Sequence, residues 1–261
     1  MGNRFLLSGE IHYFRVPRPA WGDRLRQMRD LGLNAVSTYV PWNFHQPTPE
    51  QPPDFGGSSL PERDLPGFLD LVAGTGLSCV FRPGPFITAE WRNGGLPDWL
   101  WELDPGLLAL DASGRPAGAR SGYQAVTYAH PAYEAAARRW MESALAVARD
   151  YLVSAGGPIV NVQLDDEPSY WDQLWHPLAL DYNPLLVAPA ASGSLGDGPS
   201  RYGRWLLDRY GTLAALNASH GARYVQPAGI EPPRTAEGPL AALADWHDFK
   251  LSQIDGHVAF L

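Results

Sequence analysis

Three consecutive acids, Asp165, Asp166 and Glu167, end a short apolar stretch of the chain. Residues 158–164 include β-branched types and follow a pair of glycines, a pattern that predicts a strand buried on both faces. α/β proteins place their chemistry at the carboxyl ends of such strands, so Glu167 is a candidate catalytic acid. The alternative interpretation is that the acids only end the strand in solvent, and a single strand end does not decide between the two.

Similar residue types follow three further predicted strands. The four strands are predicted over residues 5–13, 35–40, 77–82 and 158–163. Their ends carry the following set: Glu10, His12 and Tyr13; Tyr39, Trp42, Asn43 and His45; Arg82, Glu90 and Trp91; and the three acids. Carboxylates, aromatic rings and hydrogen-bonding groups at one sheet edge suit glycoside hydrolysis, in which one acid protonates the leaving oxygen and a second attacks the sugar or activates water.

The elements that must position these residues alternate between strands and helices. Apolar residues recur at helical spacing over residues 21–31, 65–72 and 133–153, between the predicted strands. This alternation indicates β/α units around a parallel sheet. A closed barrel needs eight such units, and this chain shows four.

After the acids the alternation stops. Residues 168–199 are rich in Pro, Gly, Ser and Trp and predict a long loop region, followed by short helices near 202–207 and 212–217. We predict one partial catalytic domain over residues 1–261. Its parts are the first four strands (5–167), an insertion over the active-site face (168–240) and the helix that follows the fourth strand (241–261).

Composition excludes several classes of function. The net charge is −8 and the arginines are scattered, which argues against nucleic acid as a partner. No apolar run is long enough to span a bilayer or act as a signal peptide, so we expect no membrane association and a cytoplasmic location. The single Cys79 excludes an intrachain disulfide and a cysteine zinc cluster, and the histidines lack metal-site spacing. We therefore expect neither a metal nor a cofactor.

Aromatic residues are abundant, with 10 Trp and 11 Tyr. Their flat faces can stack on sugar rings while their polar groups bind hydroxyls. Together with the acids, they favour a polyhydroxylated neutral ligand.

Five blocks of the sequence, in order, resemble glycoside hydrolase family 35, the β-galactosidases. The blocks are residues 8–13, 34–45, 82–91, 94–97 and 156–167. A later segment, 204–246, resembles an insertion of family 42 β-galactosidases. The resemblance implies a TIM (β/α)8 barrel of the glycoside hydrolase type, with about the first four β/α units present, and hydrolysis of terminal β-D-galactosyl residues with retention.

The resemblance also implies roles for individual residues. Glu167 corresponds to the general acid/base, and Tyr39, Glu90, Asp166 and Thr88 correspond to sugar-binding positions. Glu167 must hold its proton near neutral pH, which burial beside the like charges of the two preceding acids would favour.

The chain departs from the family pattern at three positions. Asp166 stands where the family has Asn, which adds charge and removes a donor when the carboxyl is ionised. This change leaves another β-linked sugar open, such as a glucosaminide or an arabinopyranoside. Thr88 replaces a common Cys, and Gln46 replaces a common Glu.

The resemblance places the nucleophilic Glu on the seventh strand, which we expect beyond Leu261. Glu10 and Glu90 are the other acids at the predicted rim, but the resemblance assigns Glu90 to binding. We therefore expect a truncated β-galactosidase-like enzyme that is inactive on its own, and that is poorly soluble or forms a homo-oligomer through an open sheet edge. The alternative is a non-catalytic carbohydrate-binding protein or a decayed half-barrel that pairs with another chain.

Overall fold

A computed structural model describes residues 5–117, 124–168, 178–190 and 198–261. The chain forms two compact units. The first comprises residues 1–103 and 135–167 with Leu261, and the second comprises residues 104–134 and 168–260. The first unit contains the sheet and all of the predicted site residues.

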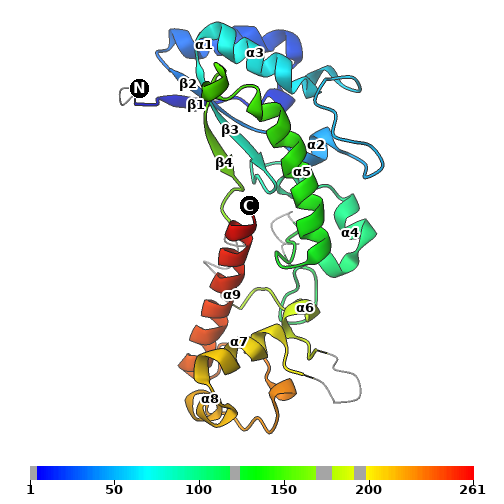
Figure 1. Cartoon of the computed structure of the whole chain (residues 1–261), viewed down its shortest axis with the longest axis vertical. Helices are drawn as coiled ribbons and strands as arrows, with labels where there is room; N and C mark the ends of the chain where they lie inside the picture. Colours follow the sequence, from blue (N-terminus) through cyan, green and yellow to red (C-terminus); the bar gives the residue numbers. More distant parts are fainter. Residues whose placement is uncertain (1–4, 118–123, 169–177, 191–197) are drawn as a thin grey trace. The chain divides into compact units, whose positions relative to one another are not determined.

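The sheet of the first unit has four parallel strands in sequence order (Figure 1). They are β1 (Ser8–Glu10), β2 (Ala35–Tyr39), β3 (Ser78–Gly84) and β4 (Ile159–Leu164). In this register Tyr39 lies beside Arg82, and Glu10 beside Ser37. The α/β class and the four predicted strands are therefore confirmed. The first strand is shorter than predicted, because the chain enters a 3-10 turn at Tyr13.

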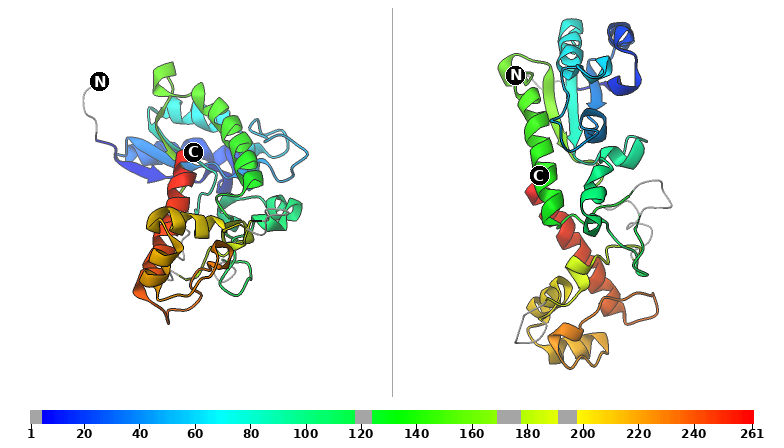
Figure 2. Two further views of the ribbon diagram at one scale, coloured as in Figure 1. Left: turned by 60° about the horizontal axis from the view of Figure 1, so that its bottom comes forward. Right: turned by 90° about the vertical axis from the view of Figure 1, so that its right-hand side faces the viewer.

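Helices connect these strands as the apolar periodicity predicts. The helices of this part of the chain are α1 (Trp21–Asp30), α2 (Trp42–His45), α3 (Leu65–Thr75), α4 (Trp99–Leu103) and α5 (Pro131–Arg149). Helices α1 and α3 pack side by side (Figures 1 and 2). Asp64 caps the start of α3 by accepting a hydrogen bond from the Gly67 amide, and Gly76 ends it with a φ of 75°. Trp140 of α5 donates to the Pro83 carbonyl at the end of β3, 2.9 Å away.

Aromatic side chains fill the core beneath the strand ends. His45 is fully buried, with its two ring nitrogens 2.6 Å from the Tyr13 hydroxyl and 2.6 Å from the Asp54 carbonyl. Burial lowers the pKa of His45 to about 4, so the imidazole is neutral at pH 7. Tyr13 stacks on Phe68, with ring centroids 5.0 Å apart. Tyr13 and His45, which were candidates at the rim, are thus core residues.

The second unit is helical in its described part. Its main elements are α6 (Pro184–Val187), α7 (Arg201–Tyr210), α8 (Leu213–His220) and α9 (Leu240–Phe260). The side chains of Ser200 and Thr212 cap α7 and α8. Trp246 and Phe249 of α9 are buried in an apolar cluster with residues of α7 and α8. The predicted short helices and the C-terminal helix are confirmed.

The extent of this unit differs from the predicted division at residues 168 and 241. Residues 104–134 belong to it, and Asp181 accepts a hydrogen bond from the Leu110 amide over 3.2 Å. Helix α9, predicted to follow the fourth strand, packs against α7 and α8 within the same unit. Part of the predicted loop region, residues 169–177 and 191–197, lies outside the described residues.

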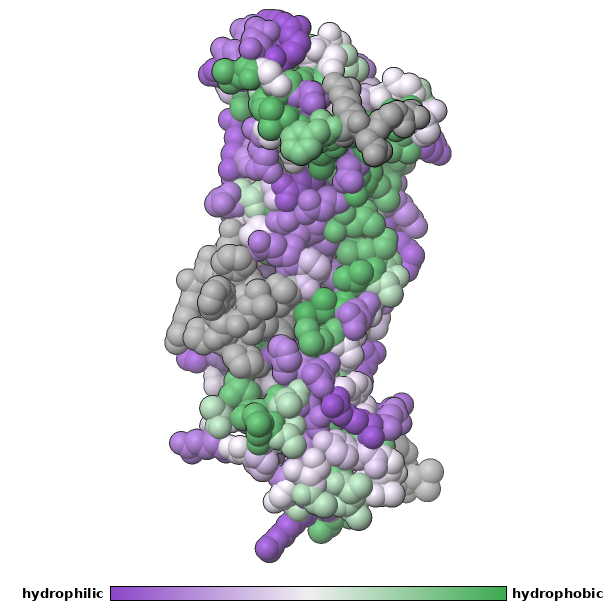
Figure 3. Space-filling model, turned by 90° about the vertical axis from the view of Figure 1, so that its left-hand side faces the viewer, coloured by the Kyte–Doolittle hydropathy of each residue, from purple (hydrophilic) through white to green (hydrophobic). Residues whose placement is uncertain are grey.

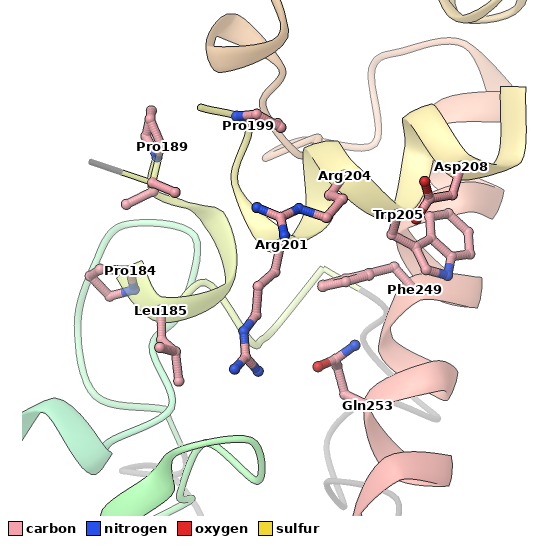
Figure 4. Close-up of a pocket in the computed structure, with 12 residues that line it drawn as sticks. Pro184, Leu185, Pro189, Pro199, Arg201, Arg204, Trp205, Asp208, Phe249 and Gln253 are labelled. Carbon is pink, nitrogen blue, oxygen red and sulfur yellow. The ribbon is translucent and has the colours of Figure 1, made fainter. Parts of the chain in front are cut away.

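A hollow of about 620 Å³ lies in the second unit (Figure 4). Trp205 and Phe249 form part of its apolar wall, and Arg201 and Arg204 lie at its polar side. No predicted site residue lines it.

Several apolar residues of the first unit are exposed. Val160 and Leu164 of β4 are each 38% exposed, and Phe5 is 81% exposed. The face drawn in Figure 3 shows hydrophobic surface interspersed with hydrophilic surface.

Among the described residues, no helix has the length and hydropathy needed to cross a bilayer.

Candidate functional site

Side chains from all four strand ends meet in one hydrogen-bonded network. Arg82, at the carboxyl end of β3, donates from Nη1 to Glu10 Oε1 over 2.6 Å and from Nη2 to Asp166 Oδ1 over 2.9 Å. Glu10 ends β1, and Asp166 follows β4. The side chains of Arg82 and Asp166 are only 14% and 11% exposed, so solvent screens this ion pair weakly.

Asp166 is the most heavily bonded acid of the site. In addition to Arg82, its carboxylate accepts hydrogen bonds from the Tyr39 hydroxyl over 3.1 Å and from Gln163 Nε2 over 2.9 Å. The Thr88 hydroxyl is a further donor to Oδ2. These four donors satisfy a buried carboxylate that would otherwise be costly to remove from water.

Tyr39 lies between the charged groups and the core. The guanidinium carbon of Arg82 is 3.7 Å from the centroid of the Tyr39 ring, within the range of a cation–π contact. Burial, and after it the nearby Asp166 carboxylate, raise the pKa of Tyr39 well above its ordinary value. The phenol therefore keeps its proton and acts as a donor.

The three acids after β4 have different environments. Asp165 is buried and accepts a hydrogen bond from the Phe86 amide over 2.9 Å. Glu167 is exposed. The backbone is left-handed at both residues, with φ of 53° at Asp165 and 48° at Glu167. The chain thus turns sharply around Asp166, which places its carboxylate in the network and Glu167 at the surface.

The expected burial of Glu167 beside two like charges is therefore not what the structure shows. Asp165 and Asp166 are the buried members, and the charge of Asp166 is paired with Arg82. The assignment of Glu167 as the general acid/base stays a prediction.

The segment that carries Thr88 and Glu90 has an unusual backbone. Thr88, Ala89 and Glu90 have φ of 46°, 51° and 42°, in the left-handed region that side chains with a Cβ disfavour. Arg15 donates from Nη2 to the carbonyl oxygens of Ala89 and Glu90, over 2.6 and 2.7 Å. Its guanidinium also lies 5.2 Å from the Trp91 ring. Arg15 therefore fixes this segment.

His12 lies beside the network without a complete set of hydrogen bonds. Its Nε2 is 4.0 Å from Glu10 Oε2, and its ring contacts those of Phe14 and Tyr39. Burial lowers the pKa of His12, against the opposing effect of Glu10, so the ring is neutral near pH 7. Its Nδ1 is buried and has no hydrogen-bond partner among the described residues.

The structure brings together most of the residues predicted from the sequence. Tyr39, Thr88 and Asp166 are in direct contact, and Glu167 follows Asp166 in the chain. Glu90 belongs to the segment that Thr88 and Arg15 hold, and its side chain is exposed. Trp42 is buried in the core, whereas Asn43 accepts a hydrogen bond from the Trp91 indole over 2.8 Å.

Three residues of the network were not predicted as site residues. The sequence indicates Arg82 as a strand-end residue but predicts no role for it, and it predicts no role for Arg15 or Gln163. Gln163 lies near the end of β4, and its Nε2 reaches Asp166 Oδ1 because the chain turns at Asp165, where φ is 53°. Arg15 lies two residues beyond the first block, and its distant carbonyl partners leave no signal in the local sequence.

Acids outnumber bases at the strand ends. The carboxylates are those of Glu10, Glu90, Asp165, Asp166 and Glu167, and the guanidinium groups are those of Arg15 and Arg82. Exposed acids beside buried, hydrogen-bonded ones can supply both a proton and fixed acceptors for hydroxyl or ammonium groups.

Curated relatives that are 40–43% identical to this chain include exo-beta-D-glucosaminidases and a beta-galactosidase. Exo-beta-D-glucosaminidase of Pyrococcus horikoshii is 42% identical over 252 residues, which cover 96% of this chain and 31% of that protein. The enzyme of the same name from Thermococcus kodakarensis is 40% identical, covering 100% of this chain and 33% of that protein. Beta-galactosidase of Felis catus is 43% identical over 173 residues, 63% of this chain and 22% of that protein. The chain thus spans about a third of the length of the two glucosaminidases.

Two solved structures share the fold at low identity. The crystal structure of β-galactosidase from the psychrophilic Marinomonas ef1 superposes with a TM-score of 0.62 at 21% identity, covering 98% of this chain and 36% of that chain. The catalytic domain of β-amylase from Paenibacillus polymyxa gives 0.63 at 14% identity, with 98% and 61% covered. These likenesses show the fold alone.

The family match agrees with the blocks quoted from the sequence. Residues 2–181, well over half of the chain, match the family described as glycosyl hydrolases family 35. This range contains every member of the strand-end network. The resemblance of residues 204–246 to family 42 lies outside the matched range and stays a prediction. The chain belongs to glycosyl hydrolases family 35.

Proposed function

We propose that the four β/α units belong to the (β/α)8 barrel of a retaining exo-glycosidase in which Glu167 is the general acid/base. Glu167 is exposed at the strand ends, where a glycosidic oxygen can reach it. In the retaining mechanism this acid first protonates the leaving oxygen and then activates water. The nucleophile, which the resemblance places on a later strand, would be supplied by residues beyond Leu261.

The sugar would lie against the network that surrounds Asp166. Tyr39 and Thr88 are hydroxyl donors on Oδ2 of this carboxylate, and both hydroxyls can rotate away when a substrate group arrives. A substrate donor would then replace a protein donor, so the carboxylate remains satisfied. The exposed Glu90 would complete the binding side.

We propose a terminal β-D-glucosaminyl residue as the substrate. The observation that supports this choice is the carboxylate of Asp166 in the strand-end network, at the position that the resemblance assigns to sugar binding, since an anion prefers an ammonium group to a neutral hydroxyl. The surplus of carboxylates over guanidinium groups at the strand ends also favours a cationic sugar. In support, the matches to glucosaminidases cover 96% and 100% of the chain, whereas the match to the cat β-galactosidase covers 63%.

A terminal β-D-galactosyl residue is the second candidate. It is favoured by the 43% identity to the cat β-galactosidase over 173 residues. In this case Asp166 would accept a hydrogen bond from a sugar hydroxyl, a role open to a carboxylate as well as to an amide oxygen.

Binding of methyl β-D-glucosaminide and methyl β-D-galactoside to the 261-residue chain tests the proposal. Two-dimensional NMR titrations at about pH 6, below the usual pKa of an aliphatic amine, keep the glucosaminide cationic. We expect tighter binding of the glucosaminide, with shifts at residues of the strand ends. Tighter binding of the galactoside would select the second candidate, and no binding of either sugar would contradict both.

Catalysis requires a separate measurement. A longer protein that contains this chain and the later strands should hydrolyse an aryl β-D-glucosaminide. Sugar binding without turnover in that protein would instead support the non-catalytic alternative.

A further inference from the structure

Arg82 is bonded to two carboxylates at once. Its Nη1 donates to Glu10 and its Nη2 to Asp166, while its plane covers the ring of Tyr39. Its Nε is buried and has no hydrogen-bond partner in the described part of the chain. The guanidinium is therefore held in one orientation by contacts on three sides.

The two carboxylate oxygens of Asp166 accept hydrogen bonds from different kinds of donor. Oδ1 accepts from the Arg82 guanidinium and from the Gln163 amide. Oδ2 accepts from the hydroxyls of Tyr39 and Thr88. Because hydroxyls rotate whereas the Arg82 guanidinium is held on several sides, Oδ2 is the oxygen whose protein donors can be replaced by a ligand donor.

The charge of Asp166 is opposed by this one arginine among the described residues. Arg15, the other arginine of the site, donates to the backbone carbonyls of Ala89 and Glu90. Glu10 competes for the same guanidinium over 2.6 Å, and its side chain is 49% exposed. The effective negative charge at Oδ2 therefore depends on how Arg82 is shared between Glu10 and Asp166.

We propose that Arg82 is a specificity-determining residue that sets the preference of the site between cationic amino sugars and neutral sugars. This inference rests on the proposed function, because it takes Asp166 as the group that meets the sugar. The positive charge of Arg82 weakens the negative potential at Asp166 enough for neutral hydroxyl groups to be accepted. Its hydrogen bond to Oδ1 also fixes the carboxylate so that Oδ2 faces the ligand.

Two substitutions of Arg82 separate charge from geometry. Arg82→Gln removes the positive charge, so the ratio of glucosaminide to galactoside affinity should rise roughly threefold to tenfold, the size expected for one charge at short range in a partly screened site. Arg82→Lys keeps the charge but loses the planar fork whose two ends bond Glu10 and Asp166. It should weaken binding of both sugars and leave the ratio within about twofold of the wild type.

Glu10→Gln tests how Arg82 is shared between Glu10 and Asp166, by a substitution at the more exposed of the two carboxylates. Without this competing carboxylate, more of the Arg82 charge opposes Asp166, and the ratio should fall about threefold. Arg29→Gln is the matched control, because Arg29 forms an ion pair with Asp30 at the end of α1, 2.9 Å away, and within the described residues it is not bonded to any member of the strand-end network. It should leave both affinities unchanged.

Dissociation constants for methyl β-D-glucosaminide and methyl β-D-galactoside, measured by NMR titration of the whole chain at low and high salt, provide the test. Amide spectra show first that each variant is folded. The proposal is supported if the ratio of glucosaminide to galactoside affinity rises in Arg82→Gln and falls in Glu10→Gln. High salt should reduce both changes in this ratio. If Arg82→Gln does not fold, an altered ratio in Arg82→Lys or an unchanged ratio in Glu10→Gln overturns the proposal.

The two levels of proposal fail in different ways. A wild-type chain that binds the glucosaminide while Arg82→Gln keeps the same ratio would overturn the role of Arg82 alone. A wild-type chain that prefers the galactoside would overturn the glucosaminide assignment, and the change in ratio would still test Arg82. A wild-type chain that binds neither sugar would overturn both.

Discussion

Tyr39 donates a hydrogen bond to Asp166 Oδ2 over 3.1 Å, although 127 residues separate them in the chain. Tyr39 ends β2 and Asp166 follows β4, with β3 between them in the sheet. Parallel strands bring their carboxyl ends to one edge, so residues distant in sequence form one site. Asp166 is therefore the group through which a change of sugar preference should be strongest.

Asp166→Asn should reverse the preference for the amino sugar. The substitution removes the charge that attracts an ammonium group, so affinity for methyl β-D-glucosaminide should fall about tenfold or more, while that for the galactoside changes little. Titrations with the two sugars measure this ratio. Asp165→Asn is the control, because Asp165 carries the same charge one residue away but accepts a hydrogen bond from the Phe86 amide. A similar loss of glucosaminide affinity in both variants would show that only the total negative charge near the site matters, not the position of Asp166.

Glu167→Gln tests the proposed general acid in a protein that contains this chain and turns over substrate. Hydrolysis of glycosides with poor leaving groups should fall by roughly 10² to 10⁴, because their leaving oxygen needs protonation. The first step with an activated aryl glycoside should be affected far less. Steady-state and pre-steady-state rates on both substrates measure the difference, and equal losses would assign Glu167 another role.

Most of the fold was predictable because its signals are local. Each helix between strands has an apolar stripe, and each strand has a short apolar run, so the order of elements followed from residues such as Trp21, Leu25 and Met28 of α1. The division into two units was not predictable in the same way. Residues 104–134 join the second unit through pairings such as Leu110 with Asp181, which are distant in the chain.

The site was predictable in its residue types but not in its connections. Tyr39, Thr88 and Asp166 were identified by the family resemblance, and the structure shows them in contact. Neither the exposure of Glu167 nor the bridge made by Arg82 could be inferred, because both depend on the sharp turn after β4. Left-handed φ values at Asp165 and Glu167 have no sequence signal comparable to that of glycine.

Arg15 should control the backbone that carries Thr88 and Glu90. Arg15→Met retains the aliphatic contacts but removes both hydrogen bonds to the Ala89 and Glu90 carbonyls. Because three successive left-handed residues are disfavoured without such support, the segment should loosen, with a loss of about 1–3 kcal/mol in stability and a loss of sugar affinity. Amide hydrogen exchange at residues 88–91 provides the measurement.

Arg15→Lys is the matched variant for this prediction. Lysine keeps the charge and its ammonium group can donate to these carbonyls, but its side chain is shorter, so it should restore part of the protection from exchange. Equal protection in the wild type and Arg15→Met would show that the segment is fixed by other contacts.

His45 should make the chain sensitive to mild acid. Its pKa is about 4 in the folded protein and near 6.5 when unfolded, so the unfolded state takes up a proton first as the pH falls. The stability contributed by the neutral ring is present above pH 6.5 and is lost as the pH falls from 6.5 towards 4. Between pH 7 and pH 5 the free energy of unfolding should decrease by about 2 kcal/mol from this residue.

Urea unfolding of the wild type and His45→Gln at the two pH values measures this effect. The variant should be less stable at pH 7, because Tyr13 and Asp54 lose a partner, but its stability should depend less on pH. The same decrease in both proteins would assign the acid sensitivity to other groups.

The outer strands of the sheet should make the isolated 261-residue chain associate. Among the described strands β1 pairs with β2 alone and β4 with β3 alone, apart from one isolated bridge between Leu152 and Ile159 at the start of β4, while Val160 and Leu164 of β4 remain partly exposed. An unpaired strand edge with apolar side chains is a site of association. We expect light scattering to show dimers or larger species, and Val160→Lys to reduce them more than Leu31→Lys, since Leu31 is exposed at the end of α1.

The same chain should not turn over aryl β-D-glucosaminides or aryl β-D-galactosides. The reason is chemical: the proton transfer proposed for Glu167 is only half of the retaining mechanism, and the resemblance places the nucleophile on a later strand. Of the other strand-end acids, Glu10 and Asp166 are paired with Arg82, Asp165 is buried, and Glu90 has the position that the resemblance assigns to sugar binding. Turnover near the usual range for enzymes, roughly 1 to 10³ per second, by a monomer of this chain would place a nucleophile within these residues. Loss of that turnover in Glu10→Gln or Glu90→Gln would then identify it.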